Sequence, residues 1–244
     1  SYKINLHEKI TLTTGFRYSH NTLTAAFDNS FIPFPYEDAK LNDGAVTGNL
    51  GLVFRPAEGW QLNGNVSTGY RMPNVDDIGK LFESAPGNLT VPNPDLSPEY
   101  AWNCEVGIIK HIPKKFRIEL NGFHTILTDA IVRRPATFNG HDSVEFDGEL
   151  SQVEALQNVA RATVWGFQAS AEVFLSEDLV LQTNANLVTG KETDDVTDEK
   201  VPLRHAPPFY GNTLLRYTWK KLFVEASAIY NSEIKYEDLA PTEQ

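Results

Sequence analysis

Apolar and polar side chains alternate along nine stretches of the chain. In residues 60–70 every second residue is Trp, Leu, Gly, Val, Thr or Tyr, and those between are Gln, Asn, Ser or Gly. A period of two predicts β-strands, because successive side chains of a strand point to opposite faces. The same pattern covers residues 10–18, 50–54, 60–70, 102–108, 116–120, 165–175, 179–187, 211–219 and 222–230. Residues 1–6 read as the end of one further strand.

The predicted connections alternate between short and long. The short ones fall near 6–9, 56–59, 112–114, 176–178 and 220–221, and the long ones near 28–42, 71–98, 135–150 and 191–204. Barrels of the outer membrane have short periplasmic turns and long extracellular loops. The sequence therefore predicts an all-β fold, an antiparallel up-and-down transmembrane β-barrel.

Charged residues avoid one face of every predicted strand. The apolar registers contain no Asp, Glu, Lys or Arg, and aromatic residues lie toward their ends, where a membrane–water boundary would be. The opposite registers carry the charges: Arg17, Arg55, Glu105, Arg117, Glu119, Glu172, Arg216 and Glu225. The ring-bearing residues at the ends are Tyr18, Trp60, Tyr70, Trp102, Phe116, Trp165, Trp219 and Tyr230.

Composition narrows the function classes. The 244 residues carry 21 Lys and Arg against 32 Asp and Glu, a net charge of −11, which argues against nucleic acid as a partner. A soluble β-sandwich would also alternate apolar and polar residues, so a soluble all-β carbohydrate-active enzyme or binding module is the alternative, and a passive porin is a third. In the enzyme reading, Glu172 and Glu225 are the candidate carboxylate pair.

Two blocks carry a family resemblance. Gly-Tyr-Arg-Met-Pro-Asn (69–74) and Val-Pro-Asn-Pro-Asp-Leu-Ser-Pro-Glu (91–99) resemble the "Tyr/Phe-Arg-Ala-Pro" and "Asn-Pro-Asn-Leu" boxes of TonB-dependent outer-membrane receptors, although Met72 stands where Ala is usual. The blocks Ala-Arg-Ala-Thr-Val-Trp-Gly-Phe-Gln, Thr-Gly-Lys and Pro-Leu-Arg-His-Ala-Pro-Pro follow in the order typical of that family.

The resemblance implies a receptor in the outer membrane of a Gram-negative cell, in contact with its lipid, and not an enzyme. Members have a barrel of roughly 22 strands around an N-terminal plug. They bind a small nutrient ligand, such as a ferric siderophore or another iron chelate, heme, cobalamin or a glycan. The TonB complex then drives uptake through the plug. We expect this chain to be a partial barrel domain over residues 1–244, with about 9–10 strands, no plug and no C-terminal strands.

The resemblance also marks candidate site residues. We expect Arg71 and Pro73 to set the transition from strand to loop, since proline ends strand pairing, and residues 93–96 to form a turn. The family-motif residues, mainly structural, are Tyr70, Arg71, Pro73, Asn74, Asn93, Pro94, Asp95 and Leu96. Ligand contacts are assigned to the extracellular loops 28–42, 71–98, 135–150 and 191–204.

No cofactor or metal site is predicted. The acidic residues Asp194, Asp195, Asp198 and Glu199 lack the spacing of an EF-hand and indicate a solvated loop. Heme receptors of the family typically have a histidine between the two boxes, and residues 75–92 contain none, which leaves His20, His141 and His205 as substitutes. His124 and the single cysteine, Cys104, fall on apolar registers.

Overall fold

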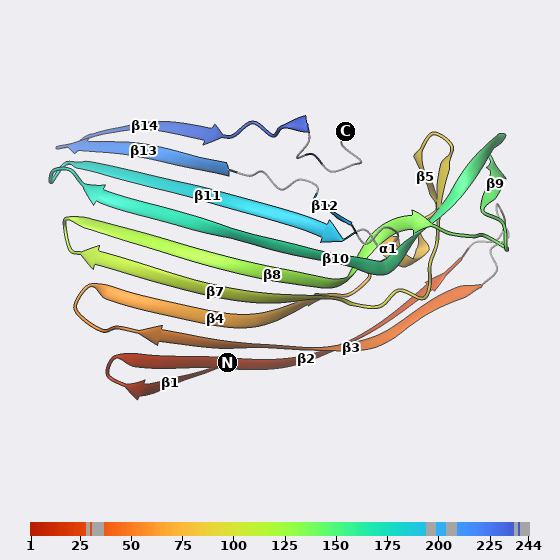
Figure 1. Ribbon diagram of the computed structural model, residues 1–244, viewed down its shortest axis with the longest axis horizontal. Coiled ribbons are helices and arrows are strands. Elements are labelled where there is room, and N and C mark those ends of the chain that lie inside the picture. Colours follow the sequence, from red (N-terminus) through yellow and green to blue (C-terminus); the bar gives the residue numbers. More distant parts are fainter. Residues whose placement is uncertain (28–29, 31–36, 194–198, 204–208, 237–238, 240–244) are drawn as a thin grey trace.

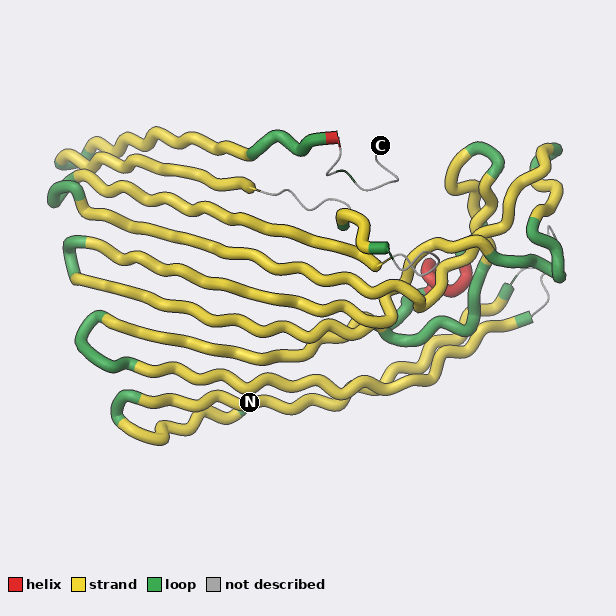
Figure 2. Tube along the Cα trace, viewed as in Figure 1, coloured by secondary structure: helices red, strands yellow, loops and turns green. Residues whose placement is uncertain are grey.

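Ten long strands form one antiparallel meander in the computed structural model (Figures 1 and 2). The structure describes all residues except 28–29, 31–36, 194–198, 204–208, 237–238 and 240–244. The strands are β1 (Tyr2–His7), β2 (Ile10–Ala26), β3 (Asp38–Phe54), β4 (Trp60–Arg71), β7 (Glu99–Ile112), β8 (Phe116–Pro135), β10 (Glu149–Phe174), β11 (Leu179–Thr193), β13 (Phe209–Trp219) and β14 (Leu222–Asn231). The predicted all-β, antiparallel up-and-down fold is confirmed.

The short and long connections lie at opposite ends of the sheet, as predicted. The short ones, at 8–9, 55–59, 113–115, 175–178 and 220–221, gather at the left of Figure 2, and the long segments lie at the right. The sheet is open. In the described part of the chain, β1 and β14 are the two ends of the strand path, and each pairs on one side only.

Large side chains and glycines alternate across the strands on one face. Phe167 lies beside Gly122, where an added Cβ would come within 3.2 Å of the aromatic ring. Glycine at this position therefore gives the ring a place to pack across the strand pair. Cross-strand partners in this row are Leu52, Gly64, Val106, Gly122, Phe167 and Leu187.

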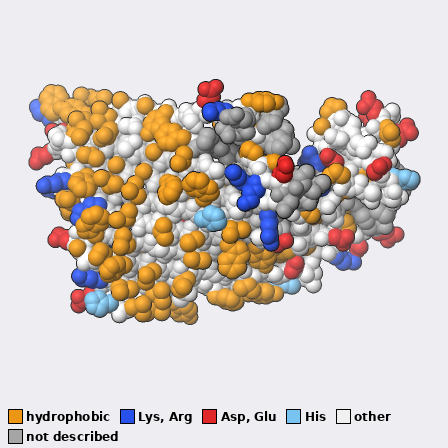
Figure 3. Space-filling model, in the orientation of Figure 1, with side chains coloured by type: hydrophobic (Ala, Val, Ile, Leu, Met, Phe, Trp, Pro, Cys, Tyr) orange, Lys and Arg blue, Asp and Glu red, His pale blue; other side chains and the backbone are white. Residues whose placement is uncertain are grey.

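The apolar registers lie on the outside of the sheet. Val106 is 63% exposed, Phe167 57% and Trp102 55%, and Figure 3 shows a broad belt of such side chains over the strands. Apolar patches of this extent mark contact with another apolar phase. A soluble β-sandwich would bury these registers as its core, so that alternative is wrong for this fold.

Lys110 continues the outward apolar register of β7 at the short-turn end. Its Nζ lies 4.7 Å from the centre of the Trp60 ring and donates a hydrogen bond to the Glu58 carbonyl in the short β3–β4 turn, at 3.3 Å. A long side chain of this kind covers apolar surface while its charge reaches the boundary. The contact marks the short-turn border of the belt.

The opposite face is polar and carries the predicted charges. Arg117 pairs with Glu119 at 2.6 Å, and Arg216 with Glu225 at 3.0 Å. Side-chain amides satisfy other carboxylates: Gln182 donates to Glu172 at 2.7 Å. This face is the inner wall of the barrel.

Three of the predicted loops contain regular structure that the sequence analysis did not predict. Residues 71–98 hold the helix α1 (Val75–Gly79) and the strands β5 (Phe82–Ala85) and β6 (Asn88–Val91). Residues 135–150 hold β9 (Ser143–Phe146), and residues 191–204 hold β12 (Lys200–Pro202). The sequence missed them because strands of three or four residues are too short to show a period.

Several strands also extend further toward the long-loop end than predicted, and β10 and β3 show the reason. β10 begins at Glu149, well before the expected start at Trp165, because its first part pairs with β9 and with β6 instead of facing lipid. β3 begins at Asp38, inside the expected loop 28–42, and pairs with β2 as far as Ala26. Both extensions lie at the long-loop end, where the alternation is lost because both faces meet protein or water.

The buried residues are concentrated at this same end of the sheet. One cluster joins Leu89 and Val91 of β6 to Val153 and Ala155 of β10 and to Phe138. A second is centred on Ile78 of α1. The helices in the described residues are all too short and too polar to cross a membrane.

We expect Val66→Arg to destabilise the barrel in a bilayer by about 2–4 kcal/mol, because the charge would replace a lipid-facing side chain in the middle of β4. The matched control is Ser67→Arg, one residue along on the inner face. Equilibrium folding of the full-length protein into lipid vesicles would measure both. Equal losses for the two variants would contradict the assignment of the faces.

Candidate functional site at the mouth of the barrel

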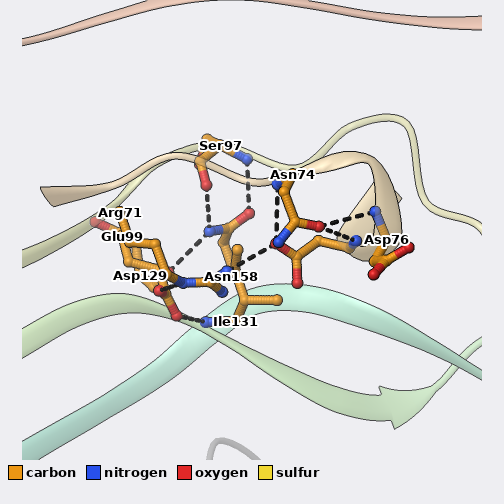
Figure 4. A network of polar contacts seen from close by, with 9 residues as sticks. Arg71, Asn74, Asp76, Ser97, Glu99, Asp129, Ile131 and Asn158 are labelled. Carbon is orange, nitrogen blue, oxygen red and sulfur yellow. Dashed lines mark hydrogen bonds and ion pairs between the residues drawn. The ribbon is translucent and has the colours of Figure 1, made fainter. Parts of the chain in front are cut away.

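The two sequence blocks meet through Arg71 (Figure 4). Arg71 ends β4 and faces Glu99, the first residue of β7, across the strand pair. Its Nε donates to one oxygen of Glu99, and its Nη1 donates to Asp77 at 2.7 Å. The hydrogen bond with Glu99 is the main cause that raises the pKa of Arg71 above its ordinary value. One guanidinium thus ties β4 to β7 and to α1.

Asn74 caps the helix. Its side-chain oxygen accepts hydrogen bonds from the backbone N–H groups of Asp76 at 2.8 Å and Asp77 at 3.0 Å, and the Asp77 carboxylate accepts from the Asn74 N–H at 2.9 Å. This is a capping box, which satisfies N–H groups that have no partner inside the helix. Pro73 is buried just before it. Asp77 therefore serves both the cap and Arg71.

The second block is held by β10. Asn93 donates to the Leu156 carbonyl at 2.7 Å and accepts from the Asp95 N–H at 3.0 Å, which forms the predicted turn. Leu96 is 3% exposed, whereas Pro94 is half-buried and Asp95 exposed. The block is therefore anchored at Asn93 and Leu96.

Asn158 of β10 clamps the end of this block. Its amide accepts from the Ser97 N–H and donates to the Ser97 carbonyl, both at 2.8 Å, and also donates to the Asp129 carbonyl of β8 at 2.8 Å. Asn158 lies where the β8–β10 register shifts, and Asp129 has a positive φ of 56°. The bulge turns backbone groups away from the ladder and makes them available to Asn158.

Helix α1 folds over the inner face of the sheet. Ile78 is 0% exposed and packs with Ala39 of β3 and Leu96. Leu23 of β2, Ile131 of β8 and Leu156 of β10 pack against this cluster. Leu23 and Ala39 share the inner registers of Arg17 and Asn49, so the segment bridges two distant parts of the wall across the mouth.

Below the mouth, the inner wall is lined by amides and carboxylates. Asn103 donates to Glu105 at 2.7 Å and accepts from Thr125 at 2.7 Å. A groove of about 480 Å³ runs along this part, with Asn63, Asn103, Glu105, Glu119, Asn121, Phe123, Thr125 and Gln168 on its sides. The wall offers hydrogen bonds along the path from the mouth to the short turns.

Two cations and an aromatic ring lie together at the mouth. Lys80 Nζ lies 4.9 Å from the centre of the Phe82 ring, and the Arg133 guanidinium carbon lies 5.2 Å from it. Arg133 also pairs with Glu154 at 3.8 Å. Lys80 and Phe82 come from the segment between the two blocks, and Arg133 comes from β8.

Other candidate residues are not brought together. Glu172 and Glu225 lie on β10 and β14, with β11 and β13 between them, so they form no catalytic pair. No group of three His, Cys, Asp or Glu residues in the described chain could hold a metal ion. His124 and Cys104 are cross-strand partners and are exposed on the lipid-facing side, whereas Asp194, Asp195, Asp198 and His205 lie outside the described residues.

The sequence analysis did not predict the residues that bind or pack against the motif residues and connect them into a network. Tyr70 packs at 6.4 Å from Tyr100 between ring centres, as neighbouring strands allow. Asp77 carried a usable signal, since an acid three residues after Asn74 is the pattern of a capping box. Glu99, Asp129 and Asn158 carried none, because their roles depend on strand register and on a bulge.

Together, the apolar outer face, the polar inner face and the infolded mouth segment define the wall of an outer-membrane β-barrel. The chain belongs to the TonB-dependent receptor family: the family described as "TonB dependent receptor-like, beta-barrel" matches residues 1–243. The outer-membrane location and the receptor class expected from the sequence are confirmed. No curated protein sequence matches the chain.

Solved structures share the fold. The siderophore receptor PirA from Acinetobacter baumannii has a TM-score of 0.66 at 18% identity, over 91% of this chain and 31% of that one. The ferric enterobactin receptor from Pseudomonas aeruginosa, as a mutant with enterobactin, has a TM-score of 0.70 at 16% identity, over 94% and 31%. The copper transporter OprC has a TM-score of 0.70 at 15% identity, over 92% and 32%. The chain thus spans about a third of the length of these structures.

We expect Arg71→Gln to destabilise the segment 72–98 by about 2–3 kcal/mol, because two largely buried carboxylates lose a charged hydrogen-bond partner. Hydrogen exchange of the full-length protein should show faster exchange in α1 and at Ile131, whose N–H donates to Glu99. Arg55→Gln, at a short turn, is the matched control. Unchanged exchange in the Arg71 variant would rule out the bridging role.

We expect Ile78→Ala to cost about 2–4 kcal/mol, because it leaves a cavity in the cluster that holds α1 on the sheet. Ile78→Val should cost about 0.5–1.5 kcal/mol. Limited proteolysis of the full-length protein within residues 72–98 would report the difference. If both variants are cleaved at the wild-type rate, Ile78 does not anchor the helix.

Proposed function

We propose that this chain is the barrel part of an outer-membrane receptor that takes up an anionic iron chelate, such as a ferric siderophore, with energy from the TonB complex acting through an N-terminal plug domain. The observation that carries the proposal is the polar inner wall, which continues from the infolded mouth down to the short turns. A passage lined by amides and carboxylates suits a polar solute. The mechanism is binding and passage, without covalent chemistry.

The cation pair at the mouth supports the choice of ligand class. Lys80 and Arg133 are both exposed and flank the Phe82 ring. Cations beside an aromatic face favour a ligand that is both negatively charged and aromatic. Ferric catecholates have both properties, whereas cobalamin lacks the high negative charge. The similar structures include a siderophore receptor and a ferric enterobactin receptor in complex with enterobactin.

The proposal can be tested by uptake assays in a Gram-negative strain that lacks its own ferric enterobactin receptor and expresses the full-length form of this receptor. We expect uptake of radiolabelled ferric enterobactin, abolished when TonB is deleted. The double variant Lys80→Gln/Arg133→Gln should reduce this uptake at least tenfold, since both charges that face the ligand are removed. Gln replacements of Lys114 and Lys115, at a short turn, are the matched control.

Neutral ferrichrome and cyanocobalamin serve as comparison solutes. Preferential uptake of either one would overturn the ligand class but keep the receptor. Entry of all solutes at rates that do not depend on TonB would favour the passive porin instead and would overturn the proposal.

A further inference from the structure

Three cations lie on the outer face of the sheet, just beyond the loop-side border of the apolar belt. They are Arg161 of β10, Lys191 of β11 and Lys200 of β12. Pairing between β10 and β11 is regular from Arg161 to Phe174, so Arg161 shares the outward face of Trp165. Lys191 shares this face as the partner of Thr163, and Lys200 as the partner of Thr193.

The register fixes how these cations are arranged. Arg161, Thr193 and Lys200 form one row across three strands, and Lys191 lies in the next row toward the belt. With strands about 4.8 Å apart, the Cα atoms of Arg161 and Lys200 are about 10 Å apart, and Lys191 lies about 7 Å from their row along the strand. The three long side chains can therefore converge on one group, with the hydroxyls of Thr163 and Thr193 between them.

These charges are not neutralised within the described chain. Arg161, Lys191 and Lys200 are exposed and form no ion pair or hydrogen bond with the side chains of other described residues. Glu192, the nearest acid on β11, lies on the inner face and pairs with Arg134 at 3.1 Å. Lys40, an exposed cation on β3, differs, because it pairs with Asp38 at 2.6 Å.

The position of the three cations relative to the membrane boundary identifies their ligand. Trp165 is 43% exposed on the outer face, as a residue at the membrane boundary is. Lys191 lies one row beyond the Trp165–Thr189 pair, and Arg161 two rows beyond it. Lipid headgroups occupy this level, and clustered cations there attract anionic lipid. Figure 3 shows Lys and Arg side chains along this border of the belt.

We propose that Arg161, Lys191 and Lys200 bind the phosphate of a phosphorylated lipid in the outer leaflet. Bidentate contacts from Arg161 and the two ammonium groups suit a phosphate with several acceptor oxygens. The site rests on the outer-membrane location and on the long loops facing outward, and it is separate from the nutrient passage. It fastens the β10–β11 part of the wall to the membrane surface.

The test uses the purified full-length receptor in detergent and lipid A that carries both phosphates. We expect saturable binding by microscale thermophoresis that weakens as salt rises. The triple variant R161Q/K191Q/K200Q should bind at least tenfold more weakly. Lipid A without phosphates should bind the wild-type protein at least tenfold more weakly too.

The matched control is K114Q/K115Q/K221Q, which removes three cations from the short-turn end and should bind as the wild type does. A compact, heat-modifiable electrophoretic band shows that each variant is folded. Equal weakening in both triple variants, equal binding of the dephosphorylated lipid, or no binding by the wild type would overturn the site. Displacement by millimolar inorganic phosphate would assign it to free phosphate instead.

This outcome is independent of the proposed uptake. Ferric enterobactin uptake, measured in the same triple variants, should stay at the wild-type level. Loss of lipid binding with uptake intact supports the lipid site alone. Loss of uptake together with lipid binding in R161Q/K191Q/K200Q would contradict the separation of the two sites.

Discussion

The structure depends on one constraint, which is that a backbone in lipid must satisfy its polar groups internally. No water reaches the hydrocarbon region to replace a missing partner. The long strands meet this condition through continuous ladders, such as the regular pairing of β2 and β3 from Ile10 to Ala26. The irregular pairing of β8 with β10, around Asn158 and Ala160, is confined to the loop-side end.

The same constraint explains where the chain forms buried hydrophobic cores like those of a soluble protein. Within the belt there is no buried core, because the apolar face meets lipid and the polar face meets the lumen. At the mouth the environment becomes aqueous, and the chain builds small cores around Leu89 and Ile78. The infolded segment is then held by these cores and by the polar network of Arg71, Glu99 and Asn158.

Charge is separated by position across the wall. On the inner face, cations and carboxylates neutralise each other or bind amides, as Arg216 and Glu225 do. At the mouth, Lys80 and Arg133 stand beside an aromatic ring. On the outer face, charge begins only where the apolar belt ends, at Lys110 on one side and at Lys191 on the other. The inner face, the mouth and the membrane boundary thus use the same side-chain types in different surroundings.

The sequence by itself determined the membrane-spanning parts of the long strands, their faces and the sorting of turns from loops. The alternation of apolar and polar residues and the absence of charged residues from the apolar face are local properties. The residues around Val66 or Phe167 were therefore sufficient to predict them. The motif residues from Tyr70 to Asn74 and from Asn93 to Leu96 could also be found, and Arg71, Asn74 and Asn93 form hydrogen bonds within the mouth segment and with the strands beside it. Only the tertiary structure decided their partners. Glu99 meets Arg71 through strand register, Asn158 meets Ser97 through a bulge, and Ile78 is buried through contacts with strands far away in the chain. These contacts join residues that are distant in sequence, and no local pattern encodes such a distance.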